Sequence, residues 1–108
     1  MLELDPSLLS LAQRQLGLPD PPPLSVGLDD ARVLLRAEPR SHYDLVLGDA
    51  FGSQAVPWHL TTREFLTELR GSLRPGGLYV ANLIDAPPLS FARAKTRTLR
   101  GVFPHVLV

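Results

Sequence analysis

Two hydrophobic patterns occur along the chain: short continuous apolar runs, and apolar residues repeated at helical spacing. The unbroken apolar run from Leu45 to Leu47 is typical of a strand that is covered on both faces. Other segments repeat apolar residues at helical spacing. Together these patterns predict the order β-α-β-α-β-α-β-α-β. This alternation indicates a parallel sheet with right-handed crossovers, in the Rossmann-like doubly wound α/β class, and we expect residues 1–108 to form a single domain.

Boundary signals place the individual elements. We expect strands at residues 1–4, 24–28, 43–49, 78–84 and 103–108. The expected N-cap residues of the four helices are Asp5, Asp29 or Asp30, Thr61 and Ser90. Gly17 should end the first helix, and the proline-rich residues 19–23 should form a polyproline-like loop.

The third predicted helix has the clearest pattern. Thr61 and Glu64 match a capping box, in which the two side chains satisfy free backbone N–H groups. The helix also carries one apolar stripe, formed by Phe65, Leu66, Leu69 and Leu73. We expect this stripe to face the core.

Composition narrows the class of protein. Apolar residues make up 44% of the chain, which is enough to build a core. Eleven basic residues balance eleven acidic ones, so the net charge gives no reason to expect nucleic acid or an anionic membrane as a partner. The chain has no cysteine, no leader-like start and no apolar stretch near the ~20 residues of a membrane helix. We therefore expect a cytoplasmic protein, with a homodimer as one assembly to consider.

Carboxylates stand at the carboxyl ends of three predicted strands, where open α/β sheets bind their ligands. Asp49 has two interpretations, a general base or a cap of the following loop. Glu3 is suited to accept hydrogen bonds from ribose hydroxyls, while the nearby Asp5 is suited to cap a helix. Asp29 and Asp30 could accept from an exocyclic amine such as that of adenine, and one of them should only cap the second helix.

Other polar residues are weaker candidates. His59 could bind substrate, although a loop histidine is more often structural or solvated. The three histidines do not have the spacing of metal ligands, so we expect no metal site. The last helix carries four basic residues that we expect to form a solvated face rather than a phosphate site, namely Arg93, Lys95, Arg97 and Arg100. A glycine-rich G-x-G turn is absent.

Several segments together resemble the spermidine synthase family of aminopropyltransferases, and more closely its bacterial spermidine synthase-like members. The matching segments are Leu2-Glu3-Leu4-Asp5-Pro6, Asp30-Ala31-Arg32, residues 43–51, residues 57–66, and Leu73-Arg74-Pro75-Gly76-Gly77 with Asn82. The Asp-Ala-Phe after a strand, followed by Pro-x-His-Leu-Thr-Thr-x-Glu-Phe, is the most specific of them. The resemblance covers nearly the whole chain.

The resemblance implies a methyltransferase-type Rossmann-like sheet and a transfer reaction in polyamine biosynthesis. Decarboxylated S-adenosylmethionine would serve as co-substrate, with no tightly bound cofactor, and a diamine such as putrescine would accept the aminopropyl group. Glu3 would hold the ribose, Asp30 the adenine amine, and Asp49 would assist deprotonation of the attacking amine.

The sequence departs from the family in two ways. Polyamine-forming members usually carry a second aspartate where this chain has Gly52. The glycine-rich first strand and the last strand of the family are also missing, so we expect an incomplete sheet, with a strand pair on each side of a gap, and a fragment that could be inactive. The alternatives are a class I S-adenosylmethionine-dependent methyltransferase, or a non-catalytic Rossmann remnant or interaction module.

Overall fold

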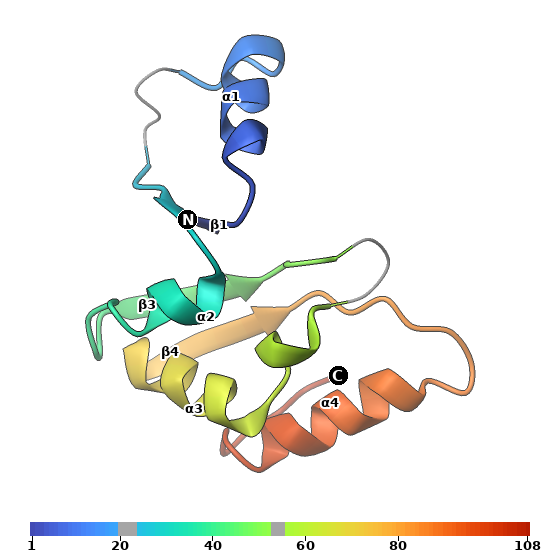
Figure 1. Ribbon diagram of the computed structural model, residues 1–108. Helices are drawn as coiled ribbons and strands as arrows, with labels where there is room; N and C mark the ends of the chain where they lie inside the picture. The colour runs from blue at the N-terminus through green and yellow to red at the C-terminus, as the bar shows by residue number, and fades with distance from the viewer. Residues whose placement is uncertain (20–23, 53–55) are drawn as a thin grey trace. The chain divides into compact units, whose positions relative to one another are not determined.

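The computed structural model describes residues 1–19, 24–52 and 56–108 (Figure 1). The chain divides into two compact units, Met1–Ala37 and Glu38–Val108, and each is described by itself. The expected loop at residues 19–23 lies almost entirely outside the described residues. Among the described helices, none combines the length and the apolar character needed to cross a membrane.

The first unit is a β-α-β-α segment. Its elements are β1 (Leu2–Glu3), α1 (Pro6–Gln15), β2 (Gly27–Leu28) and α2 (Ala31–Leu35). β1 pairs in parallel with β2, with Leu2 opposite Gly27 and Glu3 opposite Leu28. Both strands are shorter than predicted, but their positions and parallel direction agree with the prediction.

The ends of α1 are those that the sequence predicts. Asp5 is the N-cap, and its Oδ1 accepts a hydrogen bond of 2.8 Å from the backbone N–H of Ser7. Hydrogen bonds from the Ser7 hydroxyl and N–H hold the pKa of the Asp5 carboxyl below its usual range. Pro6 occupies the first helical position, and Gly17 follows the helix with a φ of 74°, which glycine adopts without strain.

The second unit continues the alternation. Its elements are β3 (Tyr43–Gly48), the 3-10 helix η1 (Trp58–Leu60), α3 (Arg63–Ser72), β4 (Leu73–Ala81) and α4 (Ser90–Arg100). β3 and β4 are parallel, and Gly48 pairs with Ala81 at their carboxyl ends. β4 begins earlier than predicted because Leu73 already pairs with Tyr43 before an irregularity in the register.

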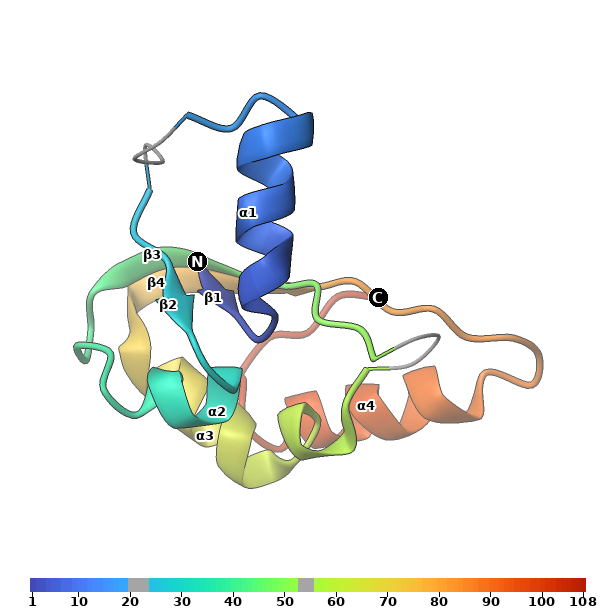
Figure 2. The same cartoon turned by 45° about the horizontal axis from the view of Figure 1, so that its top comes forward.

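The core of the second unit lies between this sheet and its helices. α3 and α4 lie on one side of the β3–β4 sheet in both views (Figures 1 and 2). All four residues of the predicted stripe are buried, together with Leu60 and Val102, although Leu73 is the first residue of β4 and not part of α3. Leu66 is completely buried at 0% exposure. The predicted core face of the third helix is therefore confirmed.

The prediction that β3 is covered on both faces is wrong. Leu45 is 49% exposed and Leu47 is 68% exposed. Their cross-strand partners Leu78 and Val80 are also exposed. The helices of this unit lie on one side of a sheet of only two strands, so the other face keeps its apolar side chains in contact with solvent.

Two predicted helix caps are wrong. Thr62, not Thr61, caps α3 and accepts from the N–H of Phe65, while the Thr61 hydroxyl donates to the carbonyl of Trp58. Ser90 is the first residue of α4 and makes no cap. The Asp85 carboxylate, which accepts from the N–H of Ala92 at 2.9 Å, takes that place.

The predicted last strand is also wrong. Residues 103–108 form no strand, and Leu107 is 99% exposed. The strands in the described part of the chain form two separate pairs, β1–β2 and β3–β4. Parallel pairing and an incomplete sheet are thus confirmed, whereas the single domain over residues 1–108 stays a prediction.

Candidate active site

Asp49 stands directly beyond the paired carboxyl ends of β3 and β4. The backbone N–H of Asn82 donates to the carbonyl of Gly48 over 3.0 Å, which extends the pairing by one residue. The side-chain amide of Asn82 then donates to Oδ1 of Asp49 over 2.9 Å. Since Asp49 is exposed, its carboxylate is oriented by Asn82 and still open to solvent.

This arrangement can hold a cation or accept a proton. A carboxylate is an acceptor only, and the Asn82 amide satisfies one of its two oxygens. Sequence reasoning matched Asn82 to the family but gave it no role. Its place one residue after β4 is the signal that could have found it, because parallel strands bring their carboxyl ends to one edge.

Close packing beneath Asp49 fixes the end of β3. The ring of Tyr79 occupies the place that a Cβ atom on Gly48 would take, with Cε2 only 2.9 Å from that position. Burial raises the pKa of the Tyr79 phenol, and the ring stacks on Phe103 at 6.0 Å between centroids. Gly48 is therefore required by the close approach of Tyr79, and the strand end that presents Asp49 has little freedom.

His59 lies in η1, between Asp49 and α3 along the chain. It is half-buried, and its ring meets that of Trp58 edge to face, with centroids 5.8 Å apart. η1 is closed by hydrogen bonds from Leu60 to Pro57 and from Thr61 to Trp58. A role for His59 in substrate binding stays a prediction.

Lys95 does not belong to a solvated face as predicted. Only 3% of it is exposed, and its Nζ donates to the carbonyl of Leu60 over 3.1 Å. Burial lowers its pKa to about 8. The other three basic residues of α4 are exposed, in agreement with the prediction.

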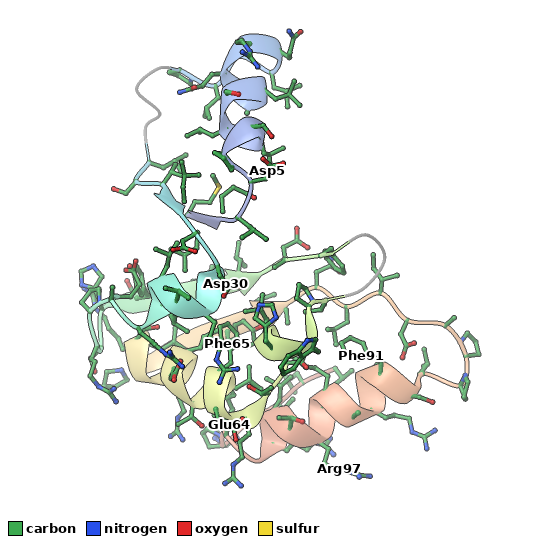
Figure 3. All side chains as sticks on the ribbon, in the orientation of Figure 1. Asp5, Asp30, Glu64, Phe65, Phe91 and Arg97 are labelled. Carbon is green, nitrogen blue, oxygen red and sulfur yellow. The ribbon has the colours of Figure 1, made fainter. Side chains whose placement is uncertain are left out.

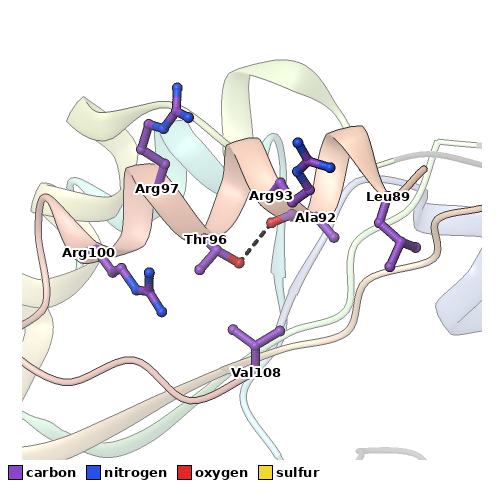
Figure 4. Close-up of a pocket in the computed structure, with 7 residues that line it drawn as sticks. All are labelled: Leu89, Ala92, Arg93, Thr96, Arg97, Arg100 and Val108. Atoms are coloured by element: carbon purple, nitrogen blue, oxygen red, sulfur yellow. Dashed lines mark hydrogen bonds between the residues drawn. The ribbon is translucent and has the colours of Figure 1, made fainter. Parts of the chain in front are cut away.

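A shallow hollow of about 480 Å³ lies along α4 (Figure 4). Its lining residues are Leu89, Ala92, Arg93, Thr96, Arg97, Arg100 and Val108. In Figure 4 Thr96 and Arg100 lie toward Val108, while the guanidinium groups of Arg93 and Arg97 extend away from it. None of the predicted site residues lines this hollow, and its arginines do not converge.

In the first unit, Glu3 and Asp29 meet at the carboxyl edge of the β1–β2 pair. The N–H of Asp29 donates to the carbonyl of Glu3 over 3.0 Å, and Oε1 of Glu3 accepts from the N–H of Asp5. Asp30 begins α2 (Figure 3), where its Oδ1 accepts from the N–H of Arg32 at 2.8 Å. Asp30 is thus the helix-capping residue of the two, and Glu3 and Asp30 belong to the same strand edge.

Three proteins are similar to this chain in sequence, and their names describe two aminopropyltransferases and one methyltransferase. The chain is 33% identical to the polyamine aminopropyltransferase of Vibrio vulnificus, over 95% of this chain and 34% of that protein. It is 30% identical to a probable polyamine aminopropyl transferase of Bifidobacterium longum, over 94% of this chain and 23% of that protein. It is also 28% identical to the eEF1A lysine and N-terminal methyltransferase of Bos taurus, over 99% of this chain and 17% of that protein. No protein-family model matches the chain.

Two crystal structures share the fold. A probable spermidine synthase from Corynebacterium glutamicum superposes with a TM-score of 0.86 and 33% identity, over 96% of this chain and 37% of that one. Spermidine synthase from Thermotoga maritima superposes with a TM-score of 0.72 over 96% of this chain and 36% of that one. At 21% identity the second match shows the fold alone.

The predicted fold class is therefore confirmed as the Rossmann-like parallel α/β fold of the spermidine synthases, in partial form. The chain spans about a third of the length of the Vibrio relative and of both crystal structures. Over that third, the chain matches members of the spermidine synthase, or polyamine aminopropyltransferase, family in both sequence and structure.

Proposed function

We propose that this chain carries part of the site of a spermidine synthase-like aminopropyltransferase. The donor would be decarboxylated S-adenosylmethionine and the acceptor a diamine such as putrescine. The observation that carries the proposal is the Asp49 carboxylate, held by Asn82 at the carboxyl edge of β3 and β4. The similarity to two aminopropyltransferases over nearly the whole chain supports it.

Asp49 is suited to the acceptor side of this reaction. A diamine is a dication near neutral pH, so its attacking nitrogen must lose a proton before it has a free electron pair. An exposed carboxylate can hold the ammonium group and take that proton. The nitrogen then forms a bond to the aminopropyl carbon that is attached to the sulfonium sulfur. The bond between that carbon and the sulfur breaks, and the donor leaves as a neutral thioether. No acid is needed at the sulfur, so most of the catalysis would come from positioning.

Glu3 and Asp30 are suited to the donor side. Glu3 would accept from the ribose hydroxyls through Oε2, since Oε1 already accepts from Asp5. Asp30, which caps α2 through Oδ1, would also accept from the adenine amine, as the resemblance implies. Both residues lie at the carboxyl edge of a parallel strand pair, which is where nucleotides bind in this class of fold.

Methyl transfer from intact S-adenosylmethionine is the second candidate. Gly52 stands where polyamine-forming members carry an aspartate that grips the amine, and methyl transfer does not need that grip. The similarity to a bovine methyltransferase also favours it. The same sulfonium chemistry would serve both reactions, so the identity of the donor separates them.

The test is a calorimetric titration of the purified, folded chain with each of the two donors, followed by putrescine. We expect binding of decarboxylated S-adenosylmethionine, its loss in Glu3→Gln, and loss of putrescine binding alone in Asp49→Asn. Asp44→Asn is the matched control, because Asp44 is an exposed aspartate on β3, the strand that ends just before Asp49. Preference for intact S-adenosylmethionine would favour the methyltransferase, and binding of neither donor would contradict both proposals.

Two further parts of the proposal concern the whole protein. A polyamine-forming enzyme of this kind would work in the cytoplasm. It could act as a homodimer, which sedimentation of the chain at several concentrations would measure.

A further inference from the structure

Lys95 is the only lysine in the chain and is almost fully buried. Ten of the eleven basic residues are arginines. Lys95 lies in the middle of α4 and is 3% exposed, whereas its neighbours Arg93 and Arg97 are exposed. Lysine is almost never fully buried unless it has a partner, so this position calls for a specific reason.

Within the described part of the chain, the hydrogen-bond partner of Lys95 is a backbone carbonyl. Its ammonium donates to the oxygen of Leu60 over 3.1 Å, and these residues are 35 positions apart. Leu60 ends η1, and the last carbonyls of a helix have no partner inside that helix. Leu60 is itself buried at 7% exposure, so water is not an easy substitute for the ammonium. The contact therefore satisfies a buried acceptor and ties α4 to η1.

Burial of Lys95 lowers the pKa of its ammonium group. The neighbouring elements carry titratable side chains, namely His59 on η1 and Glu64 and Glu68 on α3. Burial therefore removes hydration from the ammonium group of Lys95, and the group gains a charge-assisted hydrogen bond to the Leu60 carbonyl.

We propose that Lys95 is a positioning residue that holds η1 in place through the Leu60 carbonyl and so sets the position of His59. The role of His59 toward a diamine rests on the proposed function, whereas the tether itself does not. η1 follows the strand end that presents Asp49, so a fixed η1 would keep the acceptor side of the site in one arrangement. Neither the sequence pattern nor the resemblance assigns this role.

Amide hydrogen exchange measured by NMR tests the tether without any ligand. The reporters are the N–H groups of Leu60 and Thr61, which donate to Pro57 and Trp58 inside η1. In Lys95→Met we expect both to exchange about fivefold faster, the factor that corresponds to loss of a hydrogen bond of about 1 kcal/mol. Arg97→Met, on an exposed position of the same helix, should leave both rates unchanged. Equal rates in Lys95→Met and the wild type would overturn the proposal.

The only tryptophan gives a second readout. The indole N–H signal of Trp58 in η1 should move with pH around the pKa of Lys95, about 8, and should not move in Lys95→Met. His59→Gln should keep the transition, which separates Lys95 from its titratable neighbour. A transition that persists in Lys95→Met would overturn the proposal even if that variant proved hard to purify in quantity.

Ligand binding separates this proposal from the proposed function. If the tether and the function both hold, Lys95→Met should weaken putrescine binding while binding of the donor stays unchanged. If the wild type binds no donor, the function fails, and the exchange rates still decide the tether. If donor and putrescine bind Lys95→Met and wild type equally, the positioning role fails while the function stands.

Discussion

Asn82 donates its side-chain amide to Asp49 across the carboxyl ends of two parallel strands, over 2.9 Å. The register that pairs Gly48 with Ala81 places the two residues side by side. An exposed carboxylate without such a donor would sample several rotamers. Binding of a cation would then cost the conformational entropy that is lost when one rotamer is selected. The pair therefore behaves as one unit, in which Asn82 orients and Asp49 interacts.

We expect Asn82→Ala to weaken putrescine binding about tenfold, because the loss of a hydrogen bond to a charged group costs roughly 1.5 kcal/mol. The free energy of unfolding should change little, since both side chains are exposed. Calorimetry and urea denaturation measure the two quantities. Unchanged putrescine affinity in Asn82→Ala, together with its loss in Asp49→Asn, would show that Asp49 needs no orienting partner.

Gly48→Ala should destabilise the second unit. The new methyl group would meet the Tyr79 ring, with Cζ 3.0 Å from the Cβ position, and this ring is held by its stack on Phe103. Overpacking of this kind costs about 1–3 kcal/mol. Thermal unfolding measures the loss. The double variant Gly48→Ala/Tyr79→Phe should recover part of it because the hydroxyl makes the closest approach. No recovery would locate the strain elsewhere.

The sequence correctly predicted features that depend on residues close together in the chain. The cap by Asp5, the stop at Gly17 and the stripe of α3 follow from contacts within a few positions, and each is confirmed. The third strand was predicted for the same reason, from its apolar run and the polar residues after it, at residues 43–49 against the observed Tyr43–Gly48.

Features that depend on distant residues were missed. Lys95 looked like part of a charged face because its acceptor, Leu60, lies 35 positions earlier. The exposure of Leu45 and Leu47 depends on whether helices cover one or both faces of the sheet, and an apolar run in the sequence does not determine this. The Asn82 contact needed the register of β3 against β4, and register is a property of two segments together.

At the start of α4, the residue predicted as the N-cap differs from the residue that makes the capping hydrogen bond. Asp85 accepts from the N–H of Ala92, whereas Ser90 makes no cap. We expect Asp85→Ala to lower the free energy of unfolding by about 1 kcal/mol and Ser90→Ala to change it by less than about 0.5 kcal/mol. Urea denaturation of the two variants checks both values. The reverse order would restore Ser90 as the cap.

Lys95 should make the stability of the protein rise with pH above neutrality. Its folded-state pKa of about 8 lies below the ordinary value of 10.5. Below pH 8 both states are protonated, and the native state bears the full cost of a buried charge. Between pH 8 and 10.5 the unfolded chain binds the proton and the native chain does not, so the free energy of unfolding rises with pH over that window.

Lys95→Met should abolish this rise and increase stability at neutral pH. A shift of this size corresponds to at most about 3 kcal/mol, from which roughly 1 kcal/mol is lost because the Leu60 carbonyl is left without a donor. We therefore expect a net gain of about 1–2 kcal/mol, even though η1 becomes locally looser. Urea denaturation of both proteins at neutral pH and near pH 9.5 measures the change. A wild type whose stability falls over this range in parallel with that of Lys95→Met would mean that the buried amine keeps its ordinary pKa.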